Sequence, residues 1–120
     1  MPAKKSDVMH TIIKKQLSDW DMTPRQVHTN DCDTFARRVL NKARKKGLKG
    51  VKPKVCDDTE HVFLQYKGKS YDAANPSGVK DWRDLRDTQT FMRRNKRTRK
   101  SMKARNTKLS TRLRLTRRRK

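Results

Sequence analysis

The positive charge of this chain is concentrated at its C-terminal end. Residues 93–120 hold 15 Lys and Arg and no Asp or Glu, whereas residues 1–92 hold 19 Lys and Arg together with all 12 acidic residues. The C-terminal segment also has only five apolar side chains, which cannot bury enough surface to offset the entropy of ordering the chain. The sequence therefore predicts a mildly basic domain over residues 1–92 and a Lys/Arg-rich tail over residues 93–120.

The overall composition limits the class of protein. With 120 residues and a hydrophobic content of 31%, the chain can form one domain with a small core. No apolar run reaches the roughly 18 residues of a membrane-spanning helix, and the N-terminal residues lack the apolar stretch of a secretion signal. Cys32 and Cys56 are too few for a disulfide framework, so we expect free thiols in a reducing, cytoplasmic setting.

Two segments have the hydrophobic periodicity of amphipathic helices. The first covers residues 7–20, with Ser6 as the expected N-cap. The second runs from Asn30 to about Lys46 and is followed by Gly47, a residue suited to the position just past a helix end. The apolar stripe of the second helix consists of Phe35, Ala36, Val39, Leu40 and Ala43.

Aromatic and β-branched residues indicate strands after the second helix. We expect a short strand over residues 53–56 and a hairpin with strands over residues 61–66 and 69–73, joined by a turn at Lys67-Gly68. Residues 75–78 have the composition of a turn, and residues 81–85 that of a short helical turn. The predicted fold is α+β: an N-terminal helix, a central helix and an antiparallel hairpin.

Three residues on these elements could form a catalytic triad. Cys32 lies at the start of the second helix, where the positive end of the helix dipole favours a thiolate. If the hairpin turn has two residues, His61 and Asp72 are diagonal neighbours on one face of the sheet, and the carboxylate can orient the imidazole. A three-residue turn would place Asp72 on the opposite face.

The same positions carry a resemblance to a known family. Residues 30–36 (NDCDTFA), 61–64 (HVFL) and 68–72 (GKSYD) resemble the papain-like and transglutaminase-like superfamily of cysteine hydrolases, in particular its short phage and bacterial members. The resemblance implies a peptidase or amidase that needs no cofactor, with its triad at Cys32, His61 and Asp72. It also implies an oxyanion-hole glutamine six residues before the cysteine, where Gln26 stands. It covers roughly residues 26–85, excludes the tail, and implies a phage particle as a second setting.

The tail has the composition of a polyanion-binding segment. Its charge exceeds what solubility needs, so nucleic acid or another polyanion is the expected partner, bound through the phosphate backbone. Base stacking is not expected, because no aromatic residue follows Phe91. The few leucines offer too little apolar area for membrane binding. The candidate contacts are Arg93, Arg94, Lys96, Arg97, Arg99, Lys100, Arg112, Arg114, Arg117, Arg118, Arg119 and Lys120.

These features favour a cysteine hydrolase or acyl transferase that the basic tail tethers to nucleic acid in a virion or a ribonucleoprotein, where protein partners are also expected. One alternative is a non-catalytic structural nucleic-acid-binding or virion protein that keeps the fold. Another is a ribosomal or chromatin-type protein in which the order of Cys, His and Asp is a coincidence. A zinc site built from His28, Cys32, Cys56 and His61 would lack the close cysteine spacing of structural zinc sites, so no metal is expected.

Overall fold

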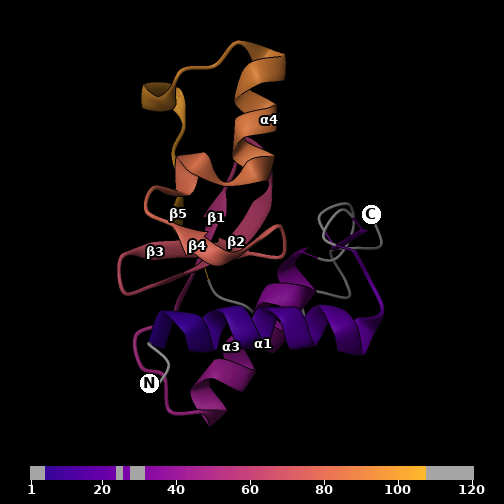
Figure 1. The fold of residues 1–120 in the computed structure, drawn as a ribbon. Helices are drawn as coiled ribbons and strands as arrows, with labels where there is room; N and C mark the ends of the chain where they lie inside the picture. Colours follow the sequence, from indigo (N-terminus) through magenta and orange to yellow (C-terminus); the bar gives the residue numbers. More distant parts are fainter. Residues whose placement is uncertain (1–4, 24–25, 28–31, 108–120) are drawn as a thin grey trace.

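A five-stranded antiparallel sheet lies between two layers of helices. The computed structural model describes residues 5–23, 26–27 and 32–107, and its strands follow the order β4-β3-β2-β1-β5. Helices α1 (Lys5–Trp20) and α3 (Cys32–Lys45) lie on one side of the sheet, and α4 (Arg86–Asn95) lies on the other (Figure 1). The α+β fold expected from the sequence is confirmed.

The central helix follows its amphipathic pattern. Its apolar stripe is buried, its first turn carries Asp33, and basic side chains occupy its last turn, which suits the helix dipole at both ends. Gly47 takes a positive φ of 86°, and the N–H of Leu48 donates to the carbonyl of Ala43, so the predicted C-terminal cap is confirmed. Because α1 begins at Lys5, Ser6 lies within its first turn and not at the expected N-cap.

The hairpin has the register on which the triad depends. Strand β1 (Lys52–Cys56) pairs with β2 (His61–Tyr66), which pairs with β3 (Lys69–Asp72). Tyr66 is the partner of Lys69, which leaves a two-residue turn. Both turn residues have positive φ, 52° at Lys67 and 79° at Gly68, as a type I′ hairpin turn requires. The predicted two-residue turn is confirmed.

The segment expected to be a turn at residues 75–78 is instead a strand, β4 (Asn75–Val79), at the edge of the sheet. An edge strand tolerates Pro76 because one side of it needs no ladder partner. Gly78 has a φ of 83°, and a Cβ there would lie 2.8 Å from the Tyr71 ring. Residue types that favour a turn thus form an edge strand here, and Gly78 leaves room for the buried Tyr71 side chain.

The structure differs from the expectation of a separate tail beginning at residue 93. Residues 86–95 form α4, which the sequence analysis missed, and the chain continues through η3 (Arg99–Ser101) to β5 (Arg105–Asn106), which pairs with β1. Residues 96–107, which lead from α4 back to the sheet, are called the return segment. Met102 in this segment is fully buried beside Cys56 and Phe63. Residues 93–107 are thus part of the folded unit, whereas residues 108–120 lie outside the described residues.

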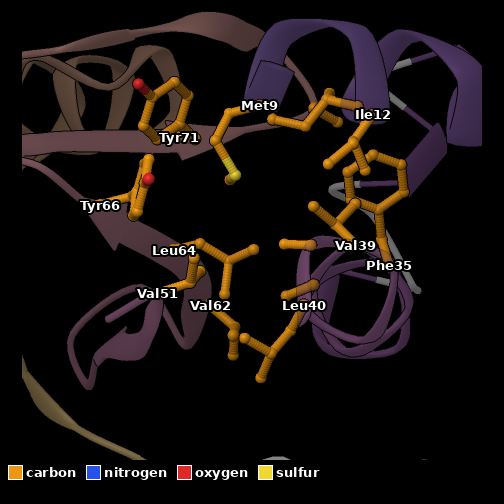
Figure 2. Packing of buried hydrophobic residues seen from close by; sticks show 14 of the residues in the cluster. Met9, Ile12, Phe35, Val39, Leu40, Val51, Val62, Leu64, Tyr66 and Tyr71 are labelled. Atoms are coloured by element: carbon orange, nitrogen blue, oxygen red, sulfur yellow. The ribbon is translucent and has the colours of Figure 1, made fainter. Parts of the chain in front are cut away.

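The two faces of the sheet have separate cores. Figure 2 shows the larger one, in which side chains of α1 and α3 face Val62, Leu64, Tyr66 and Tyr71 of the sheet. The smaller core lies on the opposite face, under α4 and the short helix η2 (Trp82–Asp84). Its buried members are Cys56, Phe63, Trp82, Leu85, Met92 and Met102.

Candidate active site

Three elements bring the predicted triad together. Cys32 is the first residue of α3, His61 the first residue of β2 and Asp72 the last residue of β3. The Cys32 thiol lies 3.9 Å from the carbonyl oxygen of Glu60, the residue just before His61. All three triad side chains line one small cavity.

The imidazole and the carboxylate form a short buried hydrogen bond. His61 Nε2 lies 2.7 Å from Asp72 Oδ2, and both side chains are only 3% exposed. The other carboxylate oxygen, Oδ1, accepts a hydrogen bond from the backbone N–H of Asn75 at 2.8 Å. With both oxygens engaged, the Asp72 carboxylate is fixed and in turn fixes the orientation of the His61 ring.

The surroundings of His61 favour its protonated form. Burial by itself lowers the pKa of His61, but hydrogen bonds with Asp72 and Cys32 and the negative charges of Asp72 and Asp87 outweigh burial and raise the pKa to about 10. The ring is therefore an imidazolium at neutral pH. An imidazolium against the Cys32 side chain can stabilise a thiolate there.

A second carboxylate faces the other nitrogen of the ring. Asp87 Oδ2 lies 4.0 Å from His61 Nδ1, and the Asp87 side chain is 33% exposed. Asp87 lies in the first turn of α4, where the helix dipole favours a negative charge. The sequence analysis did not find this residue because it did not find the helix.

The α4 layer is connected to the triad through one asparagine. The side-chain oxygen of Asn75 accepts a hydrogen bond from the backbone N–H of Arg86, the first residue of α4, at 3.1 Å. The backbone N–H of the same asparagine donates to Asp72. These two hydrogen bonds of Asn75 connect the start of α4, where Asp87 lies, to the buried Asp72 carboxylate.

Aromatic rings cover the buried side of the imidazole. The ring of Phe63 stacks on His61 with centroids 6.2 Å apart, and the ring of Trp82 stacks on Phe63 at 5.8 Å. Apart from the triad, the side chains that line the cavity at Cys32 are all apolar or aromatic. The ionisable groups of the site therefore lie among apolar groups, where electrostatic interactions are stronger than in water.

The cavity beneath the triad is small, and a larger groove lies beside it. The cavity has a volume of about 10 Å³, which is room for one water molecule. The open groove has a volume of about 720 Å³ and runs along the end of α1, over Leu17, Met22 and Ala74. Ala73 lines both spaces, so the groove reaches within one residue of Asp72.

Gln26 is not brought into the cavity with the triad. Its side chain is exposed, and its Oε1 accepts hydrogen bonds from the backbone N–H of Thr23 at 2.8 Å and from the Thr23 hydroxyl at 3.3 Å. The cavity is lined instead by its neighbour Val27. In this structure the Gln26 side chain pairs with Thr23, and the oxyanion-hole role is an expectation from the resemblance alone.

The proposed nucleic-acid contacts fall into three groups. Arg97 forms an ion pair with Asp58 at 3.1 Å, and Arg99 forms ion pairs with Asp81 at 2.7 Å and Asp84 at 2.8 Å. The other four contacts within the described segment are exposed: Arg93, Arg94, Lys96 and Lys100. The remainder lie outside the described residues: Arg112, Arg114, Arg117, Arg118, Arg119 and Lys120.

The described part of the chain has neither a metal-binding cluster nor a membrane-spanning helix. No three His, Cys, Asp or Glu side chains among the described residues are placed to hold a metal ion. His28, one residue of the zinc alternative, lies outside those residues. No helix in residues 5–23, 26–27 and 32–107 has the length and apolar character needed to cross a membrane.

No protein-family model, curated protein or solved structure matches this chain.

Proposed function

We propose that this protein is a cysteine hydrolase or acyl transferase of the papain-like and transglutaminase-like type, with Cys32 as the nucleophile. The observation that carries the proposal is the buried hydrogen bond between His61 and Asp72, with the Cys32 side chain against the same imidazole. A nucleophile, a proton carrier and a group that orients the carrier are the parts that covalent acyl transfer needs.

The geometry supports the following sequence of steps. The Cys32 thiolate attacks an amide or ester carbonyl, a bond forms between sulfur and carbon, and the carbonyl electrons move to oxygen. The His61 imidazolium donates its proton to the leaving amine or alcohol as that bond breaks. Water or an acceptor amine then attacks the thioester carbonyl and gives a proton to His61, the carbon–sulfur bond breaks, and Cys32 leaves as the thiolate. Asp72 holds the ring throughout.

The start of α3 and the adjacent groove fit the remaining needs of this reaction. Cys32 opens the described part of α3, and a backbone N–H at the start of a helix is a suitable donor to the oxyanion. The groove beside Ala73 is open to solvent and lined largely by uncharged side chains, with Lys14 and Asp21 the exceptions. An acyl chain lying there would meet the triad cavity at Ala73, the residue that lines both spaces.

The rate of Cys32 alkylation as a function of pH tests the proposal. In the wild type we expect a rate plateau that extends well below neutral pH, because the imidazolium stabilises the thiolate. His61→Gln should lose this plateau. Cys32→Ser is the control that assigns the signal to Cys32 and not to the buried Cys56. A rate that rises only near pH 8.5 in both wild type and His61→Gln, as for an ordinary thiol, would contradict the proposal.

A non-catalytic structural protein is the second candidate, and the cavity of about 10 Å³ favours it. A catalytic site must admit an acyl group, and this cavity has room for only one water molecule. On this alternative, Cys32→Ala leaves the function of the protein intact. On the catalytic proposal, the same change abolishes turnover of acyl substrates.

The proposal includes a nucleic-acid tether formed by the basic segment. The exposed Arg and Lys side chains between residues 93 and 100 support sequence-independent contact with phosphates, in a phage particle or a ribonucleoprotein. The affinity should fall steeply as salt is raised, because each phosphate contact releases a counterion. An affinity for nucleic acid that does not change with salt would contradict this part of the proposal.

A further inference from the structure

A second groove lies between α4 and the segment that follows it. Its volume is about 430 Å³. Figure 1 shows the chain turning after α4 and returning toward the sheet through η3. None of the described residues that line the groove is acidic, and three of the six are arginines: Gln89, Met92, Arg93, Arg97, Thr98 and Arg99.

Two of these arginines are held in place by carboxylates outside the groove. Arg99 donates from one terminal nitrogen to Asp84 and from the other to Asp81. Arg97 donates to Asp58 and to the side chain and carbonyl of Ser101. A guanidinium carries more N–H donors than the two that Arg99 uses in these bonds. Because both side chains are already ordered, they would lose little further entropy on contact with an anion.

The third arginine is differently placed. Arg93 is exposed in the last turn of α4, and no carboxylate of the described residues forms an ion pair with it. Arg94, Lys96 and Lys100 are exposed nearby in the sequence, so the positive charge extends beyond the groove itself. Several cations in a row suit a chain of phosphates better than one isolated anion.

We propose that this groove binds the phosphate backbone of a nucleic acid, with Arg93 as the direct contact and Arg97 and Arg99 as oriented donors. The planar guanidinium matches the geometry of phosphate oxygens, and the Thr98 hydroxyl offers one further donor. The inference rests on the tether part of the proposed function and is independent of the triad. It places that tether on the folded surface as well as on the C-terminal residues.

The test compares two arginines that occupy equivalent positions on different helices. Arg93 lies in the last turn of α4, and Arg44 lies exposed in the last turn of α3, on the other layer. The full chain is titrated into a short labelled oligothymidylate at several salt concentrations, with fluorescence anisotropy as the readout. Arg93→Gln should weaken binding about 5-fold and reduce the slope of log K against log salt by about 0.7. Arg44→Gln removes the same charge and should change neither.

Three further measurements complete the test. Arg93→Lys keeps the charge and loses the planar fork, so it should keep the salt slope and lose part of the affinity. Circular dichroism of each variant shows whether it is folded; if Arg93→Gln is not, the affinity of Arg93→Lys is compared with that of Arg44→Lys, and equal affinities would overturn the inference. Inorganic pyrophosphate at matched ionic strength is the competitor that distinguishes a single-anion site from a nucleic-acid site.

Three outcomes would overturn the inference. Equal effects of Arg93→Gln and Arg44→Gln would mean that only total charge matters. Binding of pyrophosphate without binding of the oligonucleotide would define a single-anion site. Absence of any oligonucleotide binding would remove the tether as well. The alkylation assay contains no nucleic acid, so the triad proposal can stand or fail separately from all three.

Discussion

The two faces of the sheet are covered by different kinds of structure. On the side of α1 and α3, two helices bury a continuous hydrophobic core over Val62 and Leu64. On the side of α4, a smaller core built around Phe63, Trp82 and Met102 borders the buried polar pair of His61 and Asp72. The first face has the composition of an ordinary core, whereas the second combines aromatic packing with buried charge.

The side chains of the candidate active site contact the cores on both faces of the sheet. Cys32 belongs to α3 and packs against the larger core, while His61 stacks on Phe63 of the second core. The distance between the nucleophile and the imidazole therefore depends on how the two layers are held on one sheet. A change in either core should alter the reactivity of Cys32, and substitutions on the second face test how much that face contributes to the stability of the fold.

Asp72→Asn should have the largest effect on stability. The substitution leaves the buried imidazolium of His61 without its carboxylate, and breaking a buried ion pair from one side costs about 3–5 kcal/mol. Asp87→Asn is the matched control, since that carboxylate is 4.0 Å away and partly exposed, and it should cost less than about 1 kcal/mol. Urea denaturation at neutral pH measures both. Equal losses of unfolding free energy in the two variants would show that the buried His61–Asp72 pair stabilises the fold no more than the partly exposed Asp87 does.

The pH dependence of the free energy of unfolding should also report on the His61–Asp72 pair. The pKa of His61 is about 10 in the folded protein against 6.5 as its ordinary value, so the folded state holds this proton more tightly than the unfolded chain. The stabilisation is complete below about pH 6.5, and it is lost as the pH rises through about 10. It is on the order of a few kcal/mol.

Urea denaturation of wild type and His61→Gln across this pH window tests the prediction. The wild type should lose stability more steeply toward high pH. Parallel profiles would show that His61 does not hold its proton in the folded state.

Met102→Ala should show that the return segment is part of the second core. Met102 is fully buried, and truncating a buried methionine costs about 2–4 kcal/mol. The adjacent exposed Lys103→Ala should cost less than about 0.5 kcal/mol. Thermal denaturation followed by circular dichroism measures both. If the two variants melt together, residues 93–107 do not contribute to the folded unit as the structure indicates.

Arg83→Met should have the smallest effect of the four. Arg83 donates to the carbonyl of Arg99 at 2.8 Å and to that of Met102 at 3.0 Å, and its guanidinium lies over the Trp82 ring. Loss of these bonds should cost about 1–2 kcal/mol. Arg86→Met, at an exposed position nearby, is the control. A loss no larger than the control's would mean that these bonds do not help to hold the return segment.

The elements that were predicted correctly are those with a strong local signal. The 3.6-residue spacing of apolar side chains specified α3, and the Lys67-Gly68 turn specified the hairpin register. Helix α4 was missed because only two of its residues, Thr88 and Met92, are buried within a highly charged segment. Strand β4 was read as a turn because Asn, Pro, Ser and Gly favour turns wherever no sheet edge is available to them.

The composition of the basic segment did not predict that part of it is folded against the sheet. Its few apolar residues include Met102, which fills a core that the preceding domain leaves incomplete. Its arginines find carboxylates far away in the sequence, such as Asp58 for Arg97 and Asp57 for Arg105. Nothing in the local pattern distinguishes an arginine with an internal partner from one that faces solvent.

The sequence by itself determined which residues could form a triad and that two of them share a face. The hairpin register follows from a two-residue turn, and the position of Cys32 at a helix start follows from the apolar stripe after it, because both depend on neighbours along the chain. Only the tertiary structure decided that α3 meets the start of β2, that Asp87 faces His61, and which arginines of the basic segment are paired. Those arrangements depend on contacts between distant segments, and such contacts are set by packing both faces of one sheet together.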